Sequence, residues 1–286
     1  MTIIDGKKIA NDIINELKQE VDQLNHSHIV PTLVIVQIGD EYASNVYIKN
    51  KLKLAQSLNI RAELKHFPST INDQDLINTI QQLNNDHNVN GILVQMPLPK
   101  HINEANVIEH IAPHKDVDCF HLINIGKLWT ARKSEVKLKP CTPAGIVQLL
   151  KRSHIDIEGK ETVIVGRSNI VGKPLASLLL LDNATVTLCH SLTKELRSVC
   201  KKADILISAI GKAKIIDETY IKPGAVIIDV GVNRDVHNHI CGDVDFAKIK
   251  DIPGYVTPVP GGVGPMTVVM LMQNLITLTK IQHHIQ

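Results

Sequence analysis

The stretch ETVIVGRSNIVGKP, residues 161–174, joins a short β-branched apolar run, a loop bounded by two glycines and the start of a helix pattern. Gly166 can adopt backbone angles that a side chain would forbid, and Pro174 suits the first turn of a helix. The first N–H groups of a helix have no intrahelical partners and attract anions. The stretch therefore predicts a phosphate-binding turn. Its spacing departs from G-x-G-x-x-G, however, and an ordinary strand-to-helix turn has the same appearance.

Short apolar runs alternate with helix patterns along most of the chain. Upstream, strands are expected at residues 32–38, 61–66 and 91–95, and helices at 5–24, 43–58 and 73–83. From residue 161 on, strands are expected at 184–189, 204–209 and 225–230, and a last helix at 265–281. Strands separated by such connections form parallel βαβ units. The pattern favours the α/β class, with two α/β domains flanking a cleft, the C-terminal one a Rossmann-like parallel sheet.

Composition excludes several classes of protein. The net charge of the 286 residues is only +2 and the basic residues are dispersed, which argues against a nucleic-acid partner. The five cysteines are scattered without a C-x-x-C pair, as is typical of a reducing compartment. No signal-peptide pattern opens the chain, and no apolar run is long enough to span a membrane. A soluble cytoplasmic protein is expected.

Tyr47 and Lys51 lie four residues apart in a predicted helix and therefore share one face. A lysine beside an aromatic ring in a closed site can transfer protons near neutral pH. A surface tyrosine and a solvated lysine would give the same spacing, so the catalytic interpretation requires a pocket.

A second candidate group follows the strand at residues 91–95. Gln95 ends this strand, at the edge where open α/β sheets place ligands. Asp116 and Asp118 flank Val117 in the loop KDVD, so one of them can face a pocket while the other stays in water. A carboxylate accepts two parallel N–H bonds well, whereas two acids in a loop are usually solvated or cap a helix.

The choice of dinucleotide is indicated by the end of the strand at 184–189. NAD-binding folds usually carry an acidic residue at this point, but His190 and Ser191 stand here. Arg167 and Ser168 add hydrogen-bond donors in the glycine loop. The sequence therefore predicts NADP rather than NAD.

No metal site is predicted. His237, His239 and Cys241 alternate, but neighbouring strand residues seldom close a tetrahedral site, and Asn238 suggests a hairpin turn that would break the alternation.

Six uncommon motifs, in order, give the chain a resemblance over nearly its whole length to the bifunctional methylenetetrahydrofolate dehydrogenase/cyclohydrolase family. They are Y-x-x-x-K at 47–51, VQMPLP at 94–99, KDVD at 115–118, PCTP at 140–143, GRSNIVGKP at 166–174 and PVPGGVGPMT at 258–267.

The resemblance implies two reactions. 5,10-methylenetetrahydrofolate is oxidised by NADP to the methenyl form, and water then opens this cation to 10-formyltetrahydrofolate. The expected domains are a folate-binding domain at 1–140 and an NADP-binding domain at 141–264, with the helix at about 265–286 packing back onto the first. The resemblance also implies a homodimer, no membrane partner and a place in one-carbon metabolism and purine biosynthesis.

The same resemblance assigns roles to individual residues. Lys51 is the principal catalytic residue of the hydrolytic step, Gln95 orients it, Tyr47 stacks on the folate ring and Asp118 holds the pterin edge. The remaining implied contacts to substrate are Pro260, Gly261 and Gly262, and those to NADP are Gly166, Arg167, Ser168, Ser191 and Val232.

One position departs from the family pattern. Cys119 stands where the family usually has glycine, so the backbone there is expected to avoid glycine-only conformations, with a possible tilt of Asp118 or a change in folate affinity. Two alternatives stay open. The first is another dehydrogenase, either a relative that lacks the hydrolytic step or a two-domain enzyme acting on shikimate-like substrates. The second is a catalytically silent NADP sensor.

Overall fold

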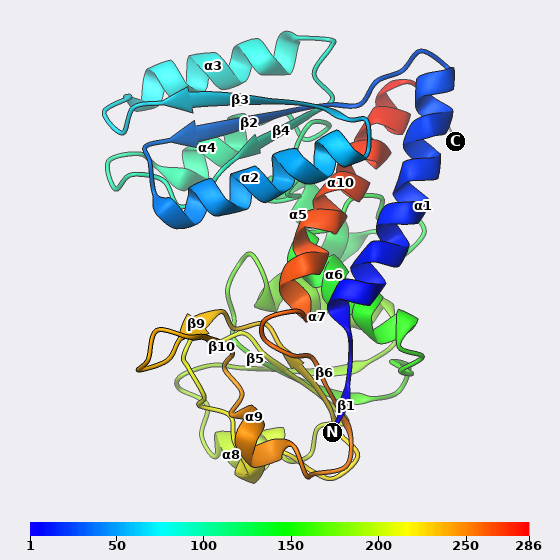
Figure 1. Ribbon diagram of the computed structural model, residues 1–286, viewed down its shortest axis with the longest axis vertical. Coiled ribbons are helices and arrows are strands. Elements are labelled where there is room, and N and C mark those ends of the chain that lie inside the picture. The colour runs from blue at the N-terminus through cyan, green and yellow to red at the C-terminus, as the bar shows by residue number, and fades with distance from the viewer. Residues whose placement is uncertain (286) are drawn as a thin grey trace. The chain divides into compact units, whose positions relative to one another are not determined.

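The computed structural model describes residues 1–285, apart from the side chain at position 43, and its chain contacts divide into two compact units (Figure 1). Unit 1 consists of Met1–Asp12 and Pro140–Thr267, and unit 2 of Ile13–Lys139 and Val268–Gln286. The division falls within two long helices, α1 (Gly6–His26) and α10 (Val263–Gln282). Among the described residues, no helix has both the length and the apolar character needed to cross a membrane.

Unit 1 is built on a six-stranded sheet in the order β1-β11-β8-β7-β5-β6, with every neighbouring pair parallel. The strands are β1 (Thr2–Ile3), β5 (Glu161–Val165), β6 (Thr185–Cys189), β7 (Ile205–Ser208), β8 (Val226–Asp229) and β11 (Tyr255–Val256). The helical elements are α6 (Cys141–Arg152), α7 (Gly172–Leu181), α8 (Leu196–Cys200), α9 (Phe246–Ile249) and the short 3-10 helix η1 (Glu218–Tyr220). A small hairpin adds β9 (Asn233–Arg234) and β10 (Ile240–Cys241).

Alternation along the strands sends apolar side chains to both faces of this sheet. Val163 and Val165 of β5 join one buried cluster with Leu206 of β7 and Ile227 of β8. Ile164, which points the other way, is also fully buried. A sheet buried on both faces needs the continuous apolar strands that the sequence has here.

Unit 2 contains a three-stranded parallel sheet in the order β3-β2-β4. Its strands are β2 (Thr32–Ile38), β3 (Arg61–Phe67) and β4 (Gly91–Val94), and its further helices are α2 (Tyr42–Ser57), α3 (Asp73–Asn85), α4 (Glu104–His110) and α5 (Leu122–Thr130). α3 and α4 share one apolar cluster with β2 and β4, while α2 lies on the opposite face from α3 (Figure 1).

The predicted α/β class and the Rossmann-like parallel sheet of the C-terminal domain are confirmed. The first twelve residues lie in unit 1, although the sequence placed residues 1–140 in one domain. The reason is that Thr2 and Ile3 pair with Tyr255 and Val256. Strands of two residues carry no periodicity that a sequence pattern can reveal.

Candidate active site

Lys51 and Gln95 meet at the carboxyl edge of the unit 2 sheet. Lys51, in α2, donates a hydrogen bond of 2.8 Å from Nζ to Oε1 of Gln95. Gln95 follows β4, and its own Nε2 donates to the carbonyl of Met96 at 2.7 Å. This second bond orients the amide so that its oxygen faces Lys51. The structure thus joins the two residues as an oriented pair.

Tyr47 lies one helical turn before Lys51, and 46% of its surface is exposed. An exposed ring on the same face as the lysine can stack on a flat ligand. The spacing that suggested a shared face is therefore realised in α2.

Gln37 supports the start of α2 and was not singled out from the sequence. Its amide is buried at the end of β2 and donates to the side chain of Asn45 and to the carbonyl of Gly39. The N-cap residue Glu41 makes no capping bond of its own to the helix backbone. Gln37 thus holds the first turns of α2 to the sheet, and a polar residue inside an otherwise apolar strand is the sequence signal for such a role.

The KDVD loop runs beside β4, with a parallel bridge between Ile92 and Asp116. Asp116 is buried and accepts hydrogen bonds from the His121 N–H at 2.9 Å and from Asn124 Nδ2 at 3.0 Å. It therefore serves the fold. Asp118, two residues further along, is half-buried.

Lys115, in the same loop, is buried and clamps it to α3. Its Nζ donates to the carbonyls of Leu83 at 2.9 Å and Asp86 at 2.7 Å. Burial lowers the pKa of Lys115, while the nearby Asp86 raises it. The motif thus contains two buried residues, Lys115 and Asp116, that anchor the loop.

Cys119 has a positive φ. Its φ is +60°, in the left-handed region that favours glycine, and its side chain is fully buried. Non-glycine residues can occupy this region at an energetic cost. The chain therefore has a φ here that favours glycine but that other residues also adopt.

The segment between β11 and α10 carries Pro260, Gly261 and Gly262 in unit 1. Pro260 is exposed, and Gly261 has a φ of +110°. A Cβ atom at Gly262 would lie 2.6 Å from the carbonyl oxygen of Pro258. The two glycines therefore allow a tight loop that side chains would prevent.

The glycine loop after β5 is compact. Gly166 has a φ of +135°, and a Cβ there would collide with the carbonyl of Ala209. A Cβ at Gly172 would collide with the carbonyl of Gly166. The loop thus depends on both glycines, and its thin backbone suits close approach of a phosphate.

The hydrogen bonding at the start of α7 differs from the expectation of free N–H groups. Ser168 Oγ accepts from the N–H groups of Val171 at 3.2 Å and Gly172 at 3.4 Å, and the Ser168 carbonyl accepts from Lys173 N–H. Pro174 has no N–H to offer. The side chains of Arg167 and Ser168 are exposed in this loop, and the Ser168 hydroxyl can still donate a hydrogen bond.

The other predicted cofactor residues follow two further strands of the same sheet, β6 and β8, which lie on either side of β5 and β7. Ser191, after β6, and Val232, after β8, are both exposed, Val232 by 58%. His190 and Ser191 follow directly after β6, where NAD-binding folds usually have an acid. The residues present fit a dinucleotide that carries an additional phosphate.

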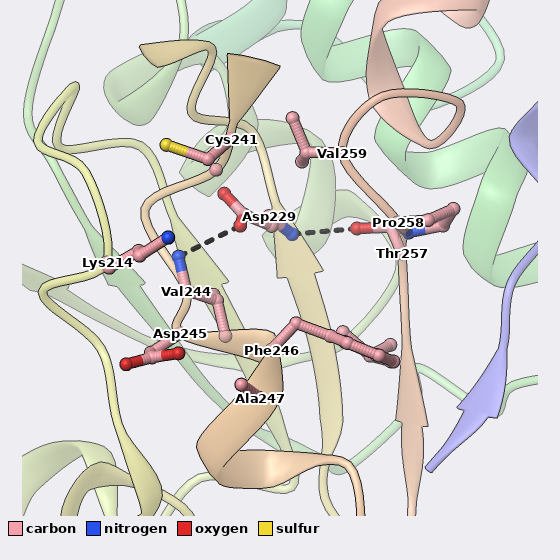
Figure 2. A pocket seen from close by; sticks show the side chains of 12 residues that line it. Lys214, Asp229, Cys241, Val244, Asp245, Phe246, Ala247, Thr257, Pro258 and Val259 are labelled. Carbon is pink, nitrogen blue, oxygen red and sulfur yellow. Dashed lines mark hydrogen bonds between the residues drawn. The ribbon is translucent and has the colours of Figure 1, made fainter. Parts of the chain in front are cut away.

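A separate cavity of about 300 Å³ lies beside β8 and β11 and contains none of the predicted site residues (Figure 2). Asp229 and Lys214 line it together with Cys241, Phe246 and Val259. The predicted hairpin turn at Asn238 is confirmed by the pairing of β9 with β10. Within the described part of the chain, no His, Cys, Asp and Glu side chains gather into a metal-binding group.

Two models of one protein family together match most of the chain. The family model "Tetrahydrofolate dehydrogenase/cyclohydrolase, catalytic domain" matches residues 4–118, and the model for the NAD(P)-binding domain of the same family matches residues 140–283. The chain belongs to the tetrahydrofolate dehydrogenase/cyclohydrolase family. A curated relative from this family, the bifunctional protein FolD of Listeria innocua, is 50% identical over 278 residues, which cover 97% of each chain.

Solved structures in the tetrahydrofolate dehydrogenase/cyclohydrolase family share the whole fold. The bifunctional FolD enzyme of Campylobacter jejuni is 42% identical, with a TM-score of 0.95 over 98% of this chain and 99% of the other. The Trypanosoma brucei FolD, solved with NADP cofactor and inhibitor, is 35% identical, with a TM-score of 0.93 over 98% of each chain. The resemblance seen in the sequence is thereby confirmed.

Proposed function

We propose that the chain oxidises 5,10-methylenetetrahydrofolate to the methenyl form with NADP and then hydrolyses the methenyl form to 10-formyltetrahydrofolate. The observation that carries the proposal is the Lys51–Gln95 hydrogen bond of 2.8 Å at the carboxyl edge of the β3-β2-β4 sheet. Family membership supplies the substrate class, and this pair supplies a group able to move protons on it.

In the hydrolytic step, Lys51 handles the protons of the attacking water and of the folate nitrogen that is released. Gln95 directs the lysine through its oxygen, because its NH₂ group is engaged by the Met96 carbonyl. The exposed ring of Tyr47 stacks on the folate. Asp118 accepts hydrogen bonds from the pterin edge, as its place in the family motif KDVD implies.

In the oxidative step, NADP accepts the hydride. Arg167 and Ser168 bind the additional phosphate together with Ser191, while Gly166 permits close approach of the backbone and Val232 contacts the nicotinamide half. The exposed side chains after β5 and β6 and the missing acid at position 191 support this assignment. Hydride transfer depends mainly on the orientation of two rings, so it requires no separate acid or base.

Unit 2 is the proposed folate-binding unit and unit 1 the NADP-binding unit, with the glycines after β11 offering backbone groups to the substrate. We further propose a cytoplasmic homodimer. Light scattering on the purified chain tests the dimer, which a monomeric mass would refute.

The test of the function is an absorbance assay with methylenetetrahydrofolate and either NADP⁺ or NAD⁺. The proposal requires NADPH formation that exceeds NADH formation, followed by loss of the methenyl absorbance. NADPH formation without subsequent hydrolysis would instead identify a dehydrogenase that lacks the second step. Cofactor binding without any NADPH would identify a silent sensor.

A further inference from the structure

Asp243 lies between β10 and α9 and has no exposed surface. Its carboxylate accepts hydrogen bonds from five groups: Ser208 Oγ, the N–H groups of Ile210, Gly211 and Lys212, and Asn233 Nδ2. The shortest of these bonds, from Ile210, is 2.7 Å. A buried carboxylate with this many donors is well compensated for its lost hydration.

The five donors belong to two segments that leave the sheet side by side. Ser208 ends β7 and is followed by residues 209–212, while Asn233 follows β8 in the next segment. β7 and β8 are neighbours in the sheet. One carboxylate thus ties together the ends of two adjacent strands.

Both segments touch the predicted cofactor residues. Ala209, between Ser208 and Ile210, is the residue whose carbonyl packs against Gly166 of the glycine loop. Asn233 directly follows Val232, whose side chain is 58% exposed. Asp243 thus holds Ile210, which follows the Ala209 that packs against Gly166, and the side chain of Asn233, which follows Val232.

Asp229 in turn holds Asp243 in place. Its carboxylate accepts from the N–H groups of Asp243 at 2.9 Å, Val244 at 2.9 Å and Gly231 at 3.0 Å. Figure 2 shows Asp229 joined to Val244 on one side and, through its own N–H, to the hydroxyl of Thr257 on the other. The packing leaves no room for a Cβ at Gly231 or Gly242, because each would collide with one of the two carboxylates.

We propose that Asp243 is a positioning residue for the nicotinamide half of the bound dinucleotide. The inference deepens the proposed function and rests on it. The direction follows from the strand order β8-β7-β5-β6: Ser191 follows β6, and Val232 follows β8 at the other side of the glycine loop. A dinucleotide whose additional phosphate lies near Ser191 must extend toward β7 and β8, where the Asp243 carboxylate orders the backbone.

Asp243→Asn is the sharpest substitution, because it keeps the size of the side chain but turns an NH₂ group toward N–H donors. Calorimetry measures how tightly this variant binds NADP⁺ and adenosine 2′,5′-bisphosphate. The bisphosphate corresponds to the adenine half of NADP⁺ and lacks the nicotinamide half. We expect the dissociation constant for NADP⁺ to rise about tenfold, as for the loss of one charge-assisted bond, and the constant for the bisphosphate to change less than about twofold.

Hydrolysis of methenyltetrahydrofolate needs no NADP, so its rate in the same sample reports whether the chain is folded. Asp217→Asn is the matched control, because Asp217 caps η1 in the same unit and contacts no predicted cofactor residue. We expect this control to bind both probes like the wild type.

Unchanged NADP⁺ affinity in Asp243→Asn would overturn the inference, and so would equal weakening for both probes, which indicates a general loss of structure. If Asp243→Asn does not fold, Asn233→Ala is used instead. It removes one of the five hydrogen-bond donors to the Asp243 carboxylate and keeps the other four. An unaltered NADP⁺ affinity in that variant would overturn the inference, and about a threefold loss would support it. A wild type that fails to bind NADP⁺ would instead refute the proposed function.

Discussion

Nζ of Lys51 lies 2.8 Å from Oε1 of Gln95, although the two residues are 44 positions apart in the chain. α2 presents the lysine, and the end of β4 presents the amide. The N–H of Gln95 also donates to the Val36 carbonyl at 2.9 Å, so the backbone that carries the amide is part of the sheet. A side chain held in this way limits the positions that the lysine can adopt.

Replacing Gln95 by glutamate tests how the amide acts on Lys51. A carboxylate at the same distance favours the charged ammonium form. We expect the pH–rate profile of methenyltetrahydrofolate hydrolysis to move upward by about one unit, with about a tenfold loss of rate near neutral pH. Gln95→Met, which adds no charge, should lower the rate without moving the profile. Superimposable profiles for wild type and Gln95→Glu would contradict the assigned role.

Replacing Arg167 by alanine tests cofactor choice. The guanidinium is exposed in the glycine loop, and we propose that it binds the additional phosphate of NADP. We expect the dissociation constant of NADP⁺ to rise about tenfold and that of NAD⁺ to rise less than about twofold. Lys201→Ala removes an exposed cation elsewhere in unit 1 and serves as the control. Equal losses for the two cofactors would refute the assignment.

Asp229 makes the stability of the chain depend on pH. Burial and, to a smaller extent, the charge of the neighbouring Asp243 raise the pKa of this carboxyl, the backbone hydrogen bonds from Val244, Asp243 and Gly231 lower it, and the net pKa is about 6 against the ordinary 3.8. The folded chain therefore keeps a proton that the unfolded chain loses. The resulting stabilisation is complete below about pH 4 and is lost as the pH rises through about 6.

We expect the stability of the wild type relative to Asp229→Asn to fall by about 1 kcal/mol between about pH 5 and pH 7. Lys214 and Asp245, which line the same cavity, are present in both proteins, so the difference isolates Asp229. Urea unfolding followed by circular dichroism gives the two free energies. A difference that does not change with pH would show that the carboxyl is ionised throughout this range.

Cys119 provides a test of backbone strain. Both Cys119→Ala and Cys119→Gly remove a buried thiol, but only glycine occupies a φ of +60° without cost. We therefore expect the glycine variant to be more stable than the alanine variant by about 1 kcal/mol, the reverse of the order at ordinary positions. Thermal unfolding of the two variants measures the difference. A more stable alanine variant would mean that the chain relaxes out of this conformation.

Much of the fold was predictable because the responsible signals are local. The expected strand at 32–38 coincides with β2, and the helix expected at 43–58 coincides with α2 to within one residue at each end. β-branched density and helical spacing are properties of short windows. The pairing of Thr2 and Ile3 with β11 could not be predicted in this way, because it depends on residues more than two hundred and fifty positions away.

In the site, too, local features could be predicted from the sequence and features that depend on the three-dimensional path of the chain could not. Tyr47 and Lys51 share a helix face because of their spacing, and that face could be predicted. The capping of α7 by Ser168 could not be predicted, because it depends on the path of the loop. In this loop the N–H groups of Val171 and Gly172, which the sequence predicts to be free for an anion, donate to Ser168 Oγ instead. Asp243 shows no motif at all, since its donors come from residues that only the sheet brings together.

The most direct test of the central claim is hydrolysis of methenyltetrahydrofolate by Lys51→Met, measured beside NADPH formation from methylenetetrahydrofolate in the same preparation. Methionine keeps the length of the side chain and removes the group that moves protons. We expect hydrolysis to fall by about a thousandfold or more, while NADPH formation continues and shows that the variant is folded. Hydrolysis at the wild-type rate would contradict it.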